Sequence, residues 1–486
     1  MRRRNILLLL ADQHRGDWMP FRPEEFLPAG GPLPLRMPNI RRLMDRGTSF
    51  TRAVTDSPLC VPARACLALG QGYDRCGAWN NDFCCPLDRD TVYRVLRDGG
   101  YEVSGTGKFD LHKPIMYWGE AGWIPQLGRL GFTRGRENEG KGDAVWAARR
   151  GRPGPYGVFL RERGLLEAYC EDHLRRAEDP EDSAAAPIPA EAYADNYVTA
   201  NALAELQALA EQEKPWFLTV NFSGPHDPWD VTGEMKAAWA GVRFPLPAEY
   251  KGDKDRLLDV RRNYGAMLEN IDRNIGVLLD ALRRLGQEED TVVIYTADHG
   301  EMLGDRNRFF KSVPYEPAVH IPLVFSGRGV LPGHVCRELA QLSDLAASIA
   351  DLAGLAMPEG TEARSLLPLA SREDAPPVRE RQYSALYPRL WAGDACPGGY
   401  EGERRFWKRP VRRTDPLRGC GAWRSVSDRV YKYIEFLDTG REALYNLQED
   451  PGETRNLAGE LPDLTSALRE LLAERPLPED WGERRE

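Results

Sequence analysis

Residues 5–14 run Asn-Ile-Leu-Leu-Leu-Leu-Ala-Asp-Gln-His, an unbroken apolar stretch that ends in polar side chains. An apolar run of this length is typical of a strand buried on both faces of a parallel sheet. The preceding Met-Arg-Arg-Arg imitates a signal peptide, but the run from Ile6 to Ala11 is shorter than a secretory core and leads into Asp12. We therefore interpret the stretch as a buried strand with polar residues at its carboxyl end.

Three more short apolar runs predict further strands of the same sheet, at residues 216–221, 291–296 and 321–325. Longer amphipathic stretches lie between them, with helix signals at residues 38–46, 91–97 and 255–285. This alternation predicts an α/β protein with a large, mostly parallel sheet sandwiched by helices. Because ligands bind beyond the carboxyl ends of such strands, we expect Asp12, His226 and Asp298 to converge.

Two regions depart from this alternation. Residues 119–189 are rich in Gly, Arg, Trp and Pro with weak periodicity, so we expect an insertion over one edge of the sheet, acting as a substrate lid. Beyond about residue 376 the composition changes, and residues 423–436 predict alternating strands before a terminal helix at 464–472. We predict a catalytic domain at 1–375 and a C-terminal α+β subdomain at 376–486, with a small antiparallel sheet and a terminal helix.

The composition excludes several classes of protein. With 42% hydrophobic and 29% charged residues among 486, the chain can bury a sizeable core. Its net charge of -9 is spread along the sequence, which argues against a nucleic-acid partner. No segment approaches the roughly 20 apolar residues that span a membrane. The nine cysteines are irregularly spaced, so we expect a reducing, cytoplasmic location. The oligomeric state stays open, a homo-oligomer included.

The segment at residues 57–70, Ser-Pro-Leu-Cys-Val-Pro-Ala-Arg-Ala-Cys-Leu-Ala-Leu-Gly, predicts a turn that leads into a helix. A side chain at a helix start meets unpaired amide donors and the positive end of the helix dipole, which favour an anion. Cys60 holds this position, and Arg64 lies one helical turn further on. An isolated cysteine is more often an inert buried thiol, so this segment alone does not identify a nucleophile.

Polar pairs follow two of the predicted strands. Asp12 and Gln13 offer oxygen ligands of the kind that a hard divalent cation prefers, although an isolated pair is more often a helix cap and turn. Asp298 and His299 follow the strand at 291–296, and such pairs often only satisfy each other. A cation site therefore depends on whether the two pairs meet.

Taken together, these segments resemble the sulfatase family, whose signature has the form Cys60-x-Pro62-x-Arg64 followed by a small-residue helix. The resemblance implies an alkaline-phosphatase-like fold. It also implies that a formylglycine-generating enzyme oxidises Cys60 to an aldehyde, 3-oxoalanine, which hydrates to a diol that attacks sulfur. Ala63 stands where many members have serine, a substitution that the family pattern tolerates, so we still expect conversion.

The resemblance also implies one divalent metal ion, calcium first and manganese or magnesium next, bound with residue 60 by Asp12, Gln13, Asp298 and His299. Gln13 departs from the Asp-Asp pair of many arylsulfatases and matches the Asp-Gln pair of the related phosphonate monoester hydrolases. The metal and the substrate class are less firmly indicated for that reason.

Four further residues correspond to the family's sulfate-binding groups. Lys108 lies in a segment similar to Gly-Lys-x-His, but His112 follows it by four residues instead of two. His226 lies in a Pro-His-x-Pro loop, and Lys311 follows the Asp-His pair. The resemblance implies that the two lysines bind the sulfate oxygens and that His226 contacts the leaving-group oxygen. It also implies that His112 assists turnover of the formylglycine and that Arg64 orients the diol. The tail at 431–434 and 444–457 resembles the family's terminal segment.

The sequence thus predicts hydrolysis of a small-molecule sulfate ester. A phosphonate monoester or phosphodiester hydrolase with the same nucleophile is the closest alternative, favoured by Gln13 and opposed by Lys108 and His112, because that group has neutral side chains there. A silent sulfatase-like binding protein is the other alternative, in which Cys60 stays a thiol. Six aromatic residues are candidates either for a substrate cleft or for the core: Trp118, Trp123, Trp146, Trp229, Tyr387 and Trp391.

Overall fold

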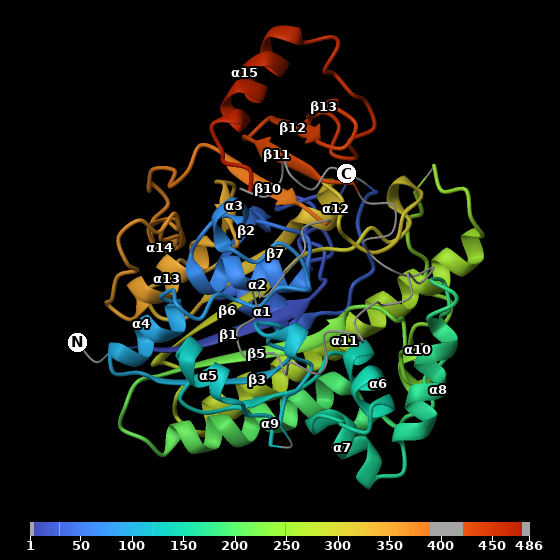
Figure 1. The fold of residues 1–486 in the computed structure, drawn as a ribbon, viewed down its shortest axis with the longest axis vertical. Coiled ribbons are helices and arrows are strands. Elements are labelled where there is room, and N and C mark those ends of the chain that lie inside the picture. The colour runs from blue at the N-terminus through green and yellow to red at the C-terminus, as the bar shows by residue number, and fades with distance from the viewer. Residues whose placement is uncertain (1–3, 29, 120, 248, 389–420, 479–486) are drawn as a thin grey trace.

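The computed structural model describes residues 4–28, 30–119, 121–247, 249–388 and 421–478. Within them, one large sheet has nine strands in the order β4-β3-β5-β1-β6-β7-β2-β8, and β9 pairs with β2 (Figure 1). The strands are β1 Asn5–Asp12, β2 Gly47–Val54, β3 Glu102–Gly107, β4 Arg136–Glu137, β5 Trp216–Pro225, β6 Thr291–Ala297, β7 His320–Ser326, β8 His334–Cys336 and β9 Ala340–Gln341.

The centre of this sheet is parallel and buried. β1 lies between β5 and β6 with both pairings parallel, so that Leu8 is opposite Thr219 on one side and Ile294 on the other. All eight residues of β1 are buried. β7 runs antiparallel to β6 and to β2. The predicted α/β class with a mostly parallel sheet is confirmed, and all four predicted strands are present.

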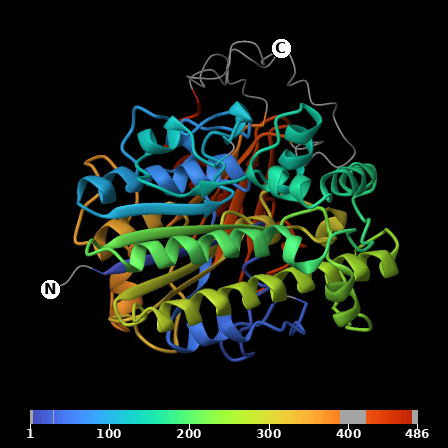
Figure 2. The same cartoon turned by 90° about the horizontal axis from the view of Figure 1, so that it is seen from below.

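Helices cover both faces of the sheet. α1 (Pro38–Asp45), α9 (Ala194–Ala210) and α11 (Lys254–Arg284) cover one face, as Figure 2 shows, with α10 (Gly233–Ala238) packed on α11. α2 (Cys60–Leu69), α4 (Val92–Asp98) and α13 (Asp344–Leu352) pack together on the other face, next to α3 (Tyr73–Cys76) and α14 (Leu367–Ser371). Two of the three predicted helices have a side-chain cap, since Thr91 accepts from the amide of Arg94 and Asp253 from that of Arg256, whereas α1 begins after Met37 without one.

The segment at 119–189 has more regular structure than its sequence indicates. It holds α5 (Pro125–Leu130), α6 (Lys141–Arg149), α7 (Pro155–Glu162), α8 (Leu166–Arg176) and the edge strand β4, which pairs with β3 (Figure 1). The prolines and glycines that weaken the periodicity mark helix starts, because α5 and α7 begin with proline and α6 is preceded by Gly140.

Short one-turn helices lie outside this segment, at Lys113–Ile115, Ala190–Ala192 and Asp305–Asn307.

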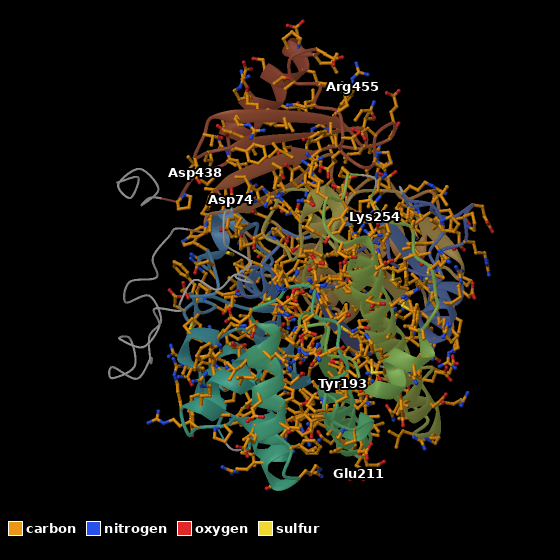
Figure 3. All side chains as sticks on the ribbon, turned by 90° about the vertical axis from the view of Figure 1, so that its right-hand side faces the viewer. Asp74, Tyr193, Glu211, Lys254, Asp438 and Arg455 are labelled. Atoms are coloured by element: carbon orange, nitrogen blue, oxygen red, sulfur yellow. The ribbon has the colours of Figure 1, made fainter. Side chains whose placement is uncertain are left out.

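The C-terminal part forms a second, four-stranded antiparallel sheet, as predicted. It contains β10 (Gln382–Leu386), β11 (Trp423–Ser427), β12 (Tyr431–Phe436) and β13 (Arg441–Asn446), with α15 (Pro462–Ala473) packed on β11 and β12. Figure 3 shows Arg455 of this part and Glu211 of the α9 end at opposite ends of the molecule.

This second sheet is fixed to the first through buried contacts. Lys432 lies 2.8 Å from Glu316, at the start of α12 (Glu316–Val319), and 2.9 Å from Glu453. The indole of Trp423 donates to the carbonyl of Ser312 over 3.1 Å. Both contacts hold the chain just after Lys311, so the small sheet supports a predicted site residue.

The state of the cysteines and the hydropathy of the helices are two further features of the described residues. Among the described residues, six cysteines are free, at positions 60, 66, 76, 85, 170 and 336, and Cys84 is disulfide-bonded. No helix in the described part of the chain is long and apolar enough to cross a membrane.

Candidate active site

Cys60 is the first residue of α2, and its side chain is buried where the ends of β1 and β6 meet. Its Sγ lies 3.3 Å from His299 Nε2 and 3.8 Å from Asp12 Oδ1. Two ammonium nitrogens are almost as close, that of Lys108 at 3.5 Å and that of Lys311 at 3.6 Å. Four residues from separate segments of the chain therefore surround this one sulfur atom.

The charges around Cys60 favour an anion at this position. Burial opposes ionisation of the thiol, and so does the neighbouring Asp12 carboxylate. Lys108, Lys311 and His299 outweigh both and hold the pKa of the thiol well below its ordinary value. A negatively charged group placed here is stabilised by cations on two sides.

The two predicted ligand pairs meet. Asp12, Cys60, Asp298 and His299 each offer a ligand atom, and these atoms lie within 4.8 Å of one another. The reason is the register of the central strands, in which Ala11 at the end of β1 is opposite Ala297 at the end of β6. His299 Nδ1 lies 3.0 Å from the carbonyl of Gly300, so that nitrogen donates, and in the neutral ring the lone pair of Nε2 faces Cys60.

Gln13 is oriented with its amide oxygen toward the site. Its Oε1 accepts from Lys311 over 2.5 Å, while its Nε2 donates to Glu301 over 2.5 Å and to Asp227 over 3.2 Å. Two carboxylates on the nitrogen side fix the assignment of the amide. Sequence reasoning missed Glu301, although its position two residues after His299 was a usable signal. Burial raises the pKa of Glu301 to about 7.

Arg64 binds the carboxylates instead of the nucleophile. Its Nε lies 2.9 Å from Asp298 and its Nη2 lies 3.1 Å from Asp12, and a third nitrogen donates to the carbonyl of Lys108. The side chain is 3% exposed. One guanidinium thus ties together the ends of β1 and β6 and the segment after β3.

His226 and Lys311 form the side of the site opposite Lys108. Lys311 Nζ lies 2.6 Å from His226 Nε2, and His226 Nδ1 lies 2.6 Å from the carbonyl of Asp227. Because Nδ1 must donate to that carbonyl, Nε2 is the ring atom that faces the site. His226 is partly exposed, with 25% of its side chain accessible, so it lies at the mouth of the site.

His112 is buried in a different pair. Its Nε2 contacts the carboxylate of Glu137 on β4, and no contact with Cys60 is seen among the described residues. Burial opposes its charge, but Glu137 raises its pKa above the ordinary value of 6.5. The four-residue spacing is the physical cause, since it carries the imidazole to the neighbouring edge strand. These contacts do not support the turnover role that the resemblance implies.

Asp110 stands two residues after Lys108, where the family pattern has its histidine. Its Oδ2 lies 3.1 Å from the ammonium nitrogens of both Lys108 and Lys113. Lys108 also pairs with Asp12, and although burial opposes its charge, Asp110 and Asp12 hold the pKa of Lys108 well above its ordinary value. Sequence reasoning missed Asp110 and Lys113 because nothing in the pattern indicates that they are buried.

A cavity of about 130 Å³ opens beside His226. Trp229 and Phe310 stack over one another in its wall, with ring planes 8° apart. The charged side chains that line it, among them Asp182 and Arg176, are paired with each other or with neighbours. A larger cavity of about 620 Å³ lies against the C-terminal sheet, but neither Cys60 nor His226 lines it. Of these two cavities, the smaller is therefore the one that a site residue, His226, lines.

Of the six aromatic candidates, two line the cavity beside His226, three lie in or against apolar clusters, and one is outside the described residues. Trp146 and Trp229 line the cavity beside His226. Trp118 and Tyr387 are buried in apolar clusters, and Trp123 packs against the main core. Trp391 lies outside the described residues.

Comparisons with known proteins agree on one family. The sulfatase family model matches residues 4–355. Choline-sulfatase of Rhizobium meliloti (strain 1021) is 26% identical over 499 residues, which cover 93% of this chain and 82% of that protein. Arylsulfatase K of Bos taurus is 24% identical over 482 residues, covering 96% and 81%. A solved phosphonate monoester hydrolase of Agrobacterium radiobacter has a TM-score of 0.74 at 22% identity, covering 97% of this chain and 95% of that one, a similarity of fold alone.

Proposed function

The chain belongs to the sulfatase family, and on that premise we propose that this sulfuric ester hydrolase acts through formylglycine at position 60 beside one divalent cation. The chemistry that formylglycine supplies is attack on sulfur by a hydroxyl of the hydrated aldehyde. Conversion requires a formylglycine-generating enzyme as a partner during maturation.

The observation that carries the proposal is the convergence of cations on residue 60. Lys108 and Lys311 approach Cys60 Sγ to 3.5 and 3.6 Å from two sides. A sulfate monoester spreads one negative charge over three oxygens, and charge moves to the leaving oxygen as the ester bond breaks. Fixed ammonium groups in a buried site stabilise that charge without having to reorganise.

The residues at the ends of β1 and β6 fit a hard cation. Asp12, Gln13, Asp298 and His299 would hold it, because three of them supply oxygen and His299 keeps a free lone pair. In the structure the amines of Lys108 and Lys311 lie against Asp12 and Gln13, so this donor set already attracts positive charge. The bound cation supplies Lewis-acid polarisation of sulfate oxygens. We propose calcium, with manganese or magnesium as alternatives.

Other residues of the chain stabilise the carboxylates, serve the leaving group and bind the organic part of the ester. Arg64 pairs with the carboxylates of Asp12 and Asp298 and offsets their negative charge in a buried site. His226 presents Nε2 to the mouth of the site. In the structure this nitrogen accepts from Lys311, and once Lys311 binds the ester's oxygens Nε2 is free to carry a proton for the leaving-group oxygen. The organic part of the ester then enters the cavity beside His226, which excludes water from that oxygen.

The first test is the mass of the tryptic peptide of residues 53–64, taken from protein co-produced with a formylglycine-generating enzyme. We expect it to be about 18 Da lighter than the cysteine form, because a thiol carbon has become an aldehyde. We also expect Cys60→Ala to abolish turnover while the thermal unfolding midpoint stays close to that of the wild type, since the change removes little volume. An unmodified peptide, or an active Cys60→Ala protein, contradicts the proposal.

Gln13 supports a second candidate, a phosphonate monoester hydrolase. It provides one negative charge fewer than the Asp-Asp pair of many arylsulfatases. The charged pair of Lys108 and Asp110 opposes this candidate, because the resemblance gives that group neutral side chains in this segment. Sulfate esters, aryl phosphonates and phosphodiesters, each assayed with calcium, manganese and magnesium, separate the two candidates. A silent binding protein would show an unmodified peptide and no turnover on any of them.

A further inference from the structure

The first turn of α6 contacts both halves of the active site. Its Lys141 Nζ lies 2.9 Å from the carbonyl of His226, 3.4 Å from that of Pro228 and 2.6 Å from Asp230. The lysine side chain is 1% exposed. Because Lys141 binds two backbone carbonyls of the loop that carries His226, it fixes the backbone position from which the His226 side chain extends.

Asp143, also in the first turn, begins a buried chain of alternating charge that ends at Lys108. It lies 2.8 Å from Lys113, and Lys113 lies 3.1 Å from Asp110. Asp110 in turn lies 3.1 Å from Lys108, whose ammonium is the one beside Cys60. Each of the four side chains is at most 8% exposed. Charges buried in this way hold one another in place, since none can turn away without losing a partner.

Gly140 brings α6 directly against the stem of Lys108. A Cβ on Gly140 would lie 2.8 Å from Lys108 Cε and 3.1 Å from Asp143 Oδ2. The helix start, the lysine stem and the first link of the charge chain are therefore in contact. In Figure 1, α6 lies beside α7 and α8.

We propose that Asp143 and Lys141 are positioning residues for the reaction, Asp143 through Lys113 and Asp110 to Lys108, and Lys141 through the loop of His226. The inference rests on the proposed function, because it takes Lys108 to bind the ester's oxygens and His226 to serve its leaving group. One helix turn then sets the separation between the group that holds the anion and the group that protonates the leaving oxygen. A misplacement of about 1 Å in such groups costs up to about a hundredfold in rate.

The Asp143 arm is tested by a double-mutant cycle with Lys108. We expect Asp143→Asn to lower kcat/KM about tenfold in the wild-type background and less than about twofold in the Lys108→Ala background. Lys113→Met should match Asp143→Asn, and Lys113→Arg should restore most of the activity, because it keeps the charge between the two carboxylates. Equal losses in both backgrounds would show that Asp143 only supports the fold, and would overturn this arm.

The Lys141 arm is tested with a series of aryl esters whose phenols differ in acidity. If Lys141 acts through His226, Lys141→Met lowers kcat most for the least acidic phenols, which most need a proton as they leave. Asp143→Asn should lower kcat/KM by the same factor for every phenol, because Lys108 contacts the anion common to all of them. A uniform loss in Lys141→Met overturns this arm.

Asp272→Asn is the matched control for removing a buried, hydrogen-bonded aspartate. Asp272, on α11, accepts from the amide of Ile40 over 2.7 Å and from the side chain of Asn39 over 2.9 Å, where α11 packs on α1. We expect lower stability with unchanged kcat/KM. All arms are measured with whichever ester the wild type hydrolyses best, sulfate or phosphonate. If the wild type does not prefer sulfate esters, the proposed function is overturned. If the losses in kcat/KM caused by Asp143→Asn and Lys108→Ala simply add, the positioning inference is overturned instead.

Discussion

The ammonium nitrogen of Lys108 lies 3.5 Å from Sγ of Cys60 and is held there by carboxylates on both of its other sides. Its position puts a fixed positive charge beside the nucleophile before any substrate arrives. A charge that is already in place assists attack on an anion without a cost of reorganisation.

Replacing Lys108 by alanine should therefore reduce kcat/KM for sulfate esters. The lost charge-assisted contact is worth about 1.5 to 3 kcal/mol, which corresponds to a loss of about 10-fold to 150-fold. Initial rates over a range of ester concentrations measure it. Lys254→Ala, at the exposed start of α11, is the control and should behave as the wild type (Figure 3). A wild-type rate in Lys108→Ala would remove this lysine from the mechanism.

The cavity beside His226 can be narrowed from a position where a side chain fits. Gly142 lines the cavity, and a Cβ added there meets no atom within 4 Å. We expect Gly142→Phe to raise KM for esters with a ring about tenfold, because the ring and the new side chain compete for one space. Gly142→Ala should leave KM unchanged and stabilise the helix slightly. The inhibition constant of inorganic sulfate should stay the same in both variants, since sulfate does not need the cavity. Unchanged KM in Gly142→Phe would place the organic group elsewhere.

The buried pair of His112 and Glu137 should make stability depend on pH in a definite direction. Because Glu137 raises the pKa of His112 above 6.5 in the folded protein, the folded state binds this proton more tightly than the unfolded state. The stabilisation is therefore complete below 6.5 and is lost as the pH rises through the folded pKa. Urea unfolding of the wild type and of His112→Gln, at about pH 5.5 and pH 8.5, measures it. The free-energy difference between the two proteins should shrink at the higher pH, and a difference that grows would contradict the pair.

The sequence predicts the fold and the meeting of the two polar pairs for related reasons. The strands at 5–10 and 291–296 are short apolar runs, and in a parallel sheet their carboxyl ends meet at one edge, so the convergence of Asp12 with Asp298 follows from the pattern. The roles of Lys108 and Lys311 came from the family resemblance, and the structure brings both to Cys60.

The groups that sequence reasoning missed are polar residues buried by tertiary contacts. Lys141 and Asp143 lie in a Gly-rich stretch whose periodicity is weak, and nothing local distinguishes them from solvated charges. Their burial depends on the loop of His226 and on Lys113. His112 is the opposite case, since the sequence motif singled it out as a site residue. Its shifted spacing places the imidazole against Glu137 and not beside Cys60.

The ratio of kcat/KM for an aryl sulfate to that for an aryl phosphonate monoester with the same phenol tests the central claim most directly. The leaving group is then constant, and only the anion that Lys108, Lys311 and the cation site recognise differs. We predict a ratio well above one for the enzyme that carries formylglycine at position 60. A ratio far below one would keep the family and contradict the reaction, and Gln13 would then be the better guide to the substrate than Lys108.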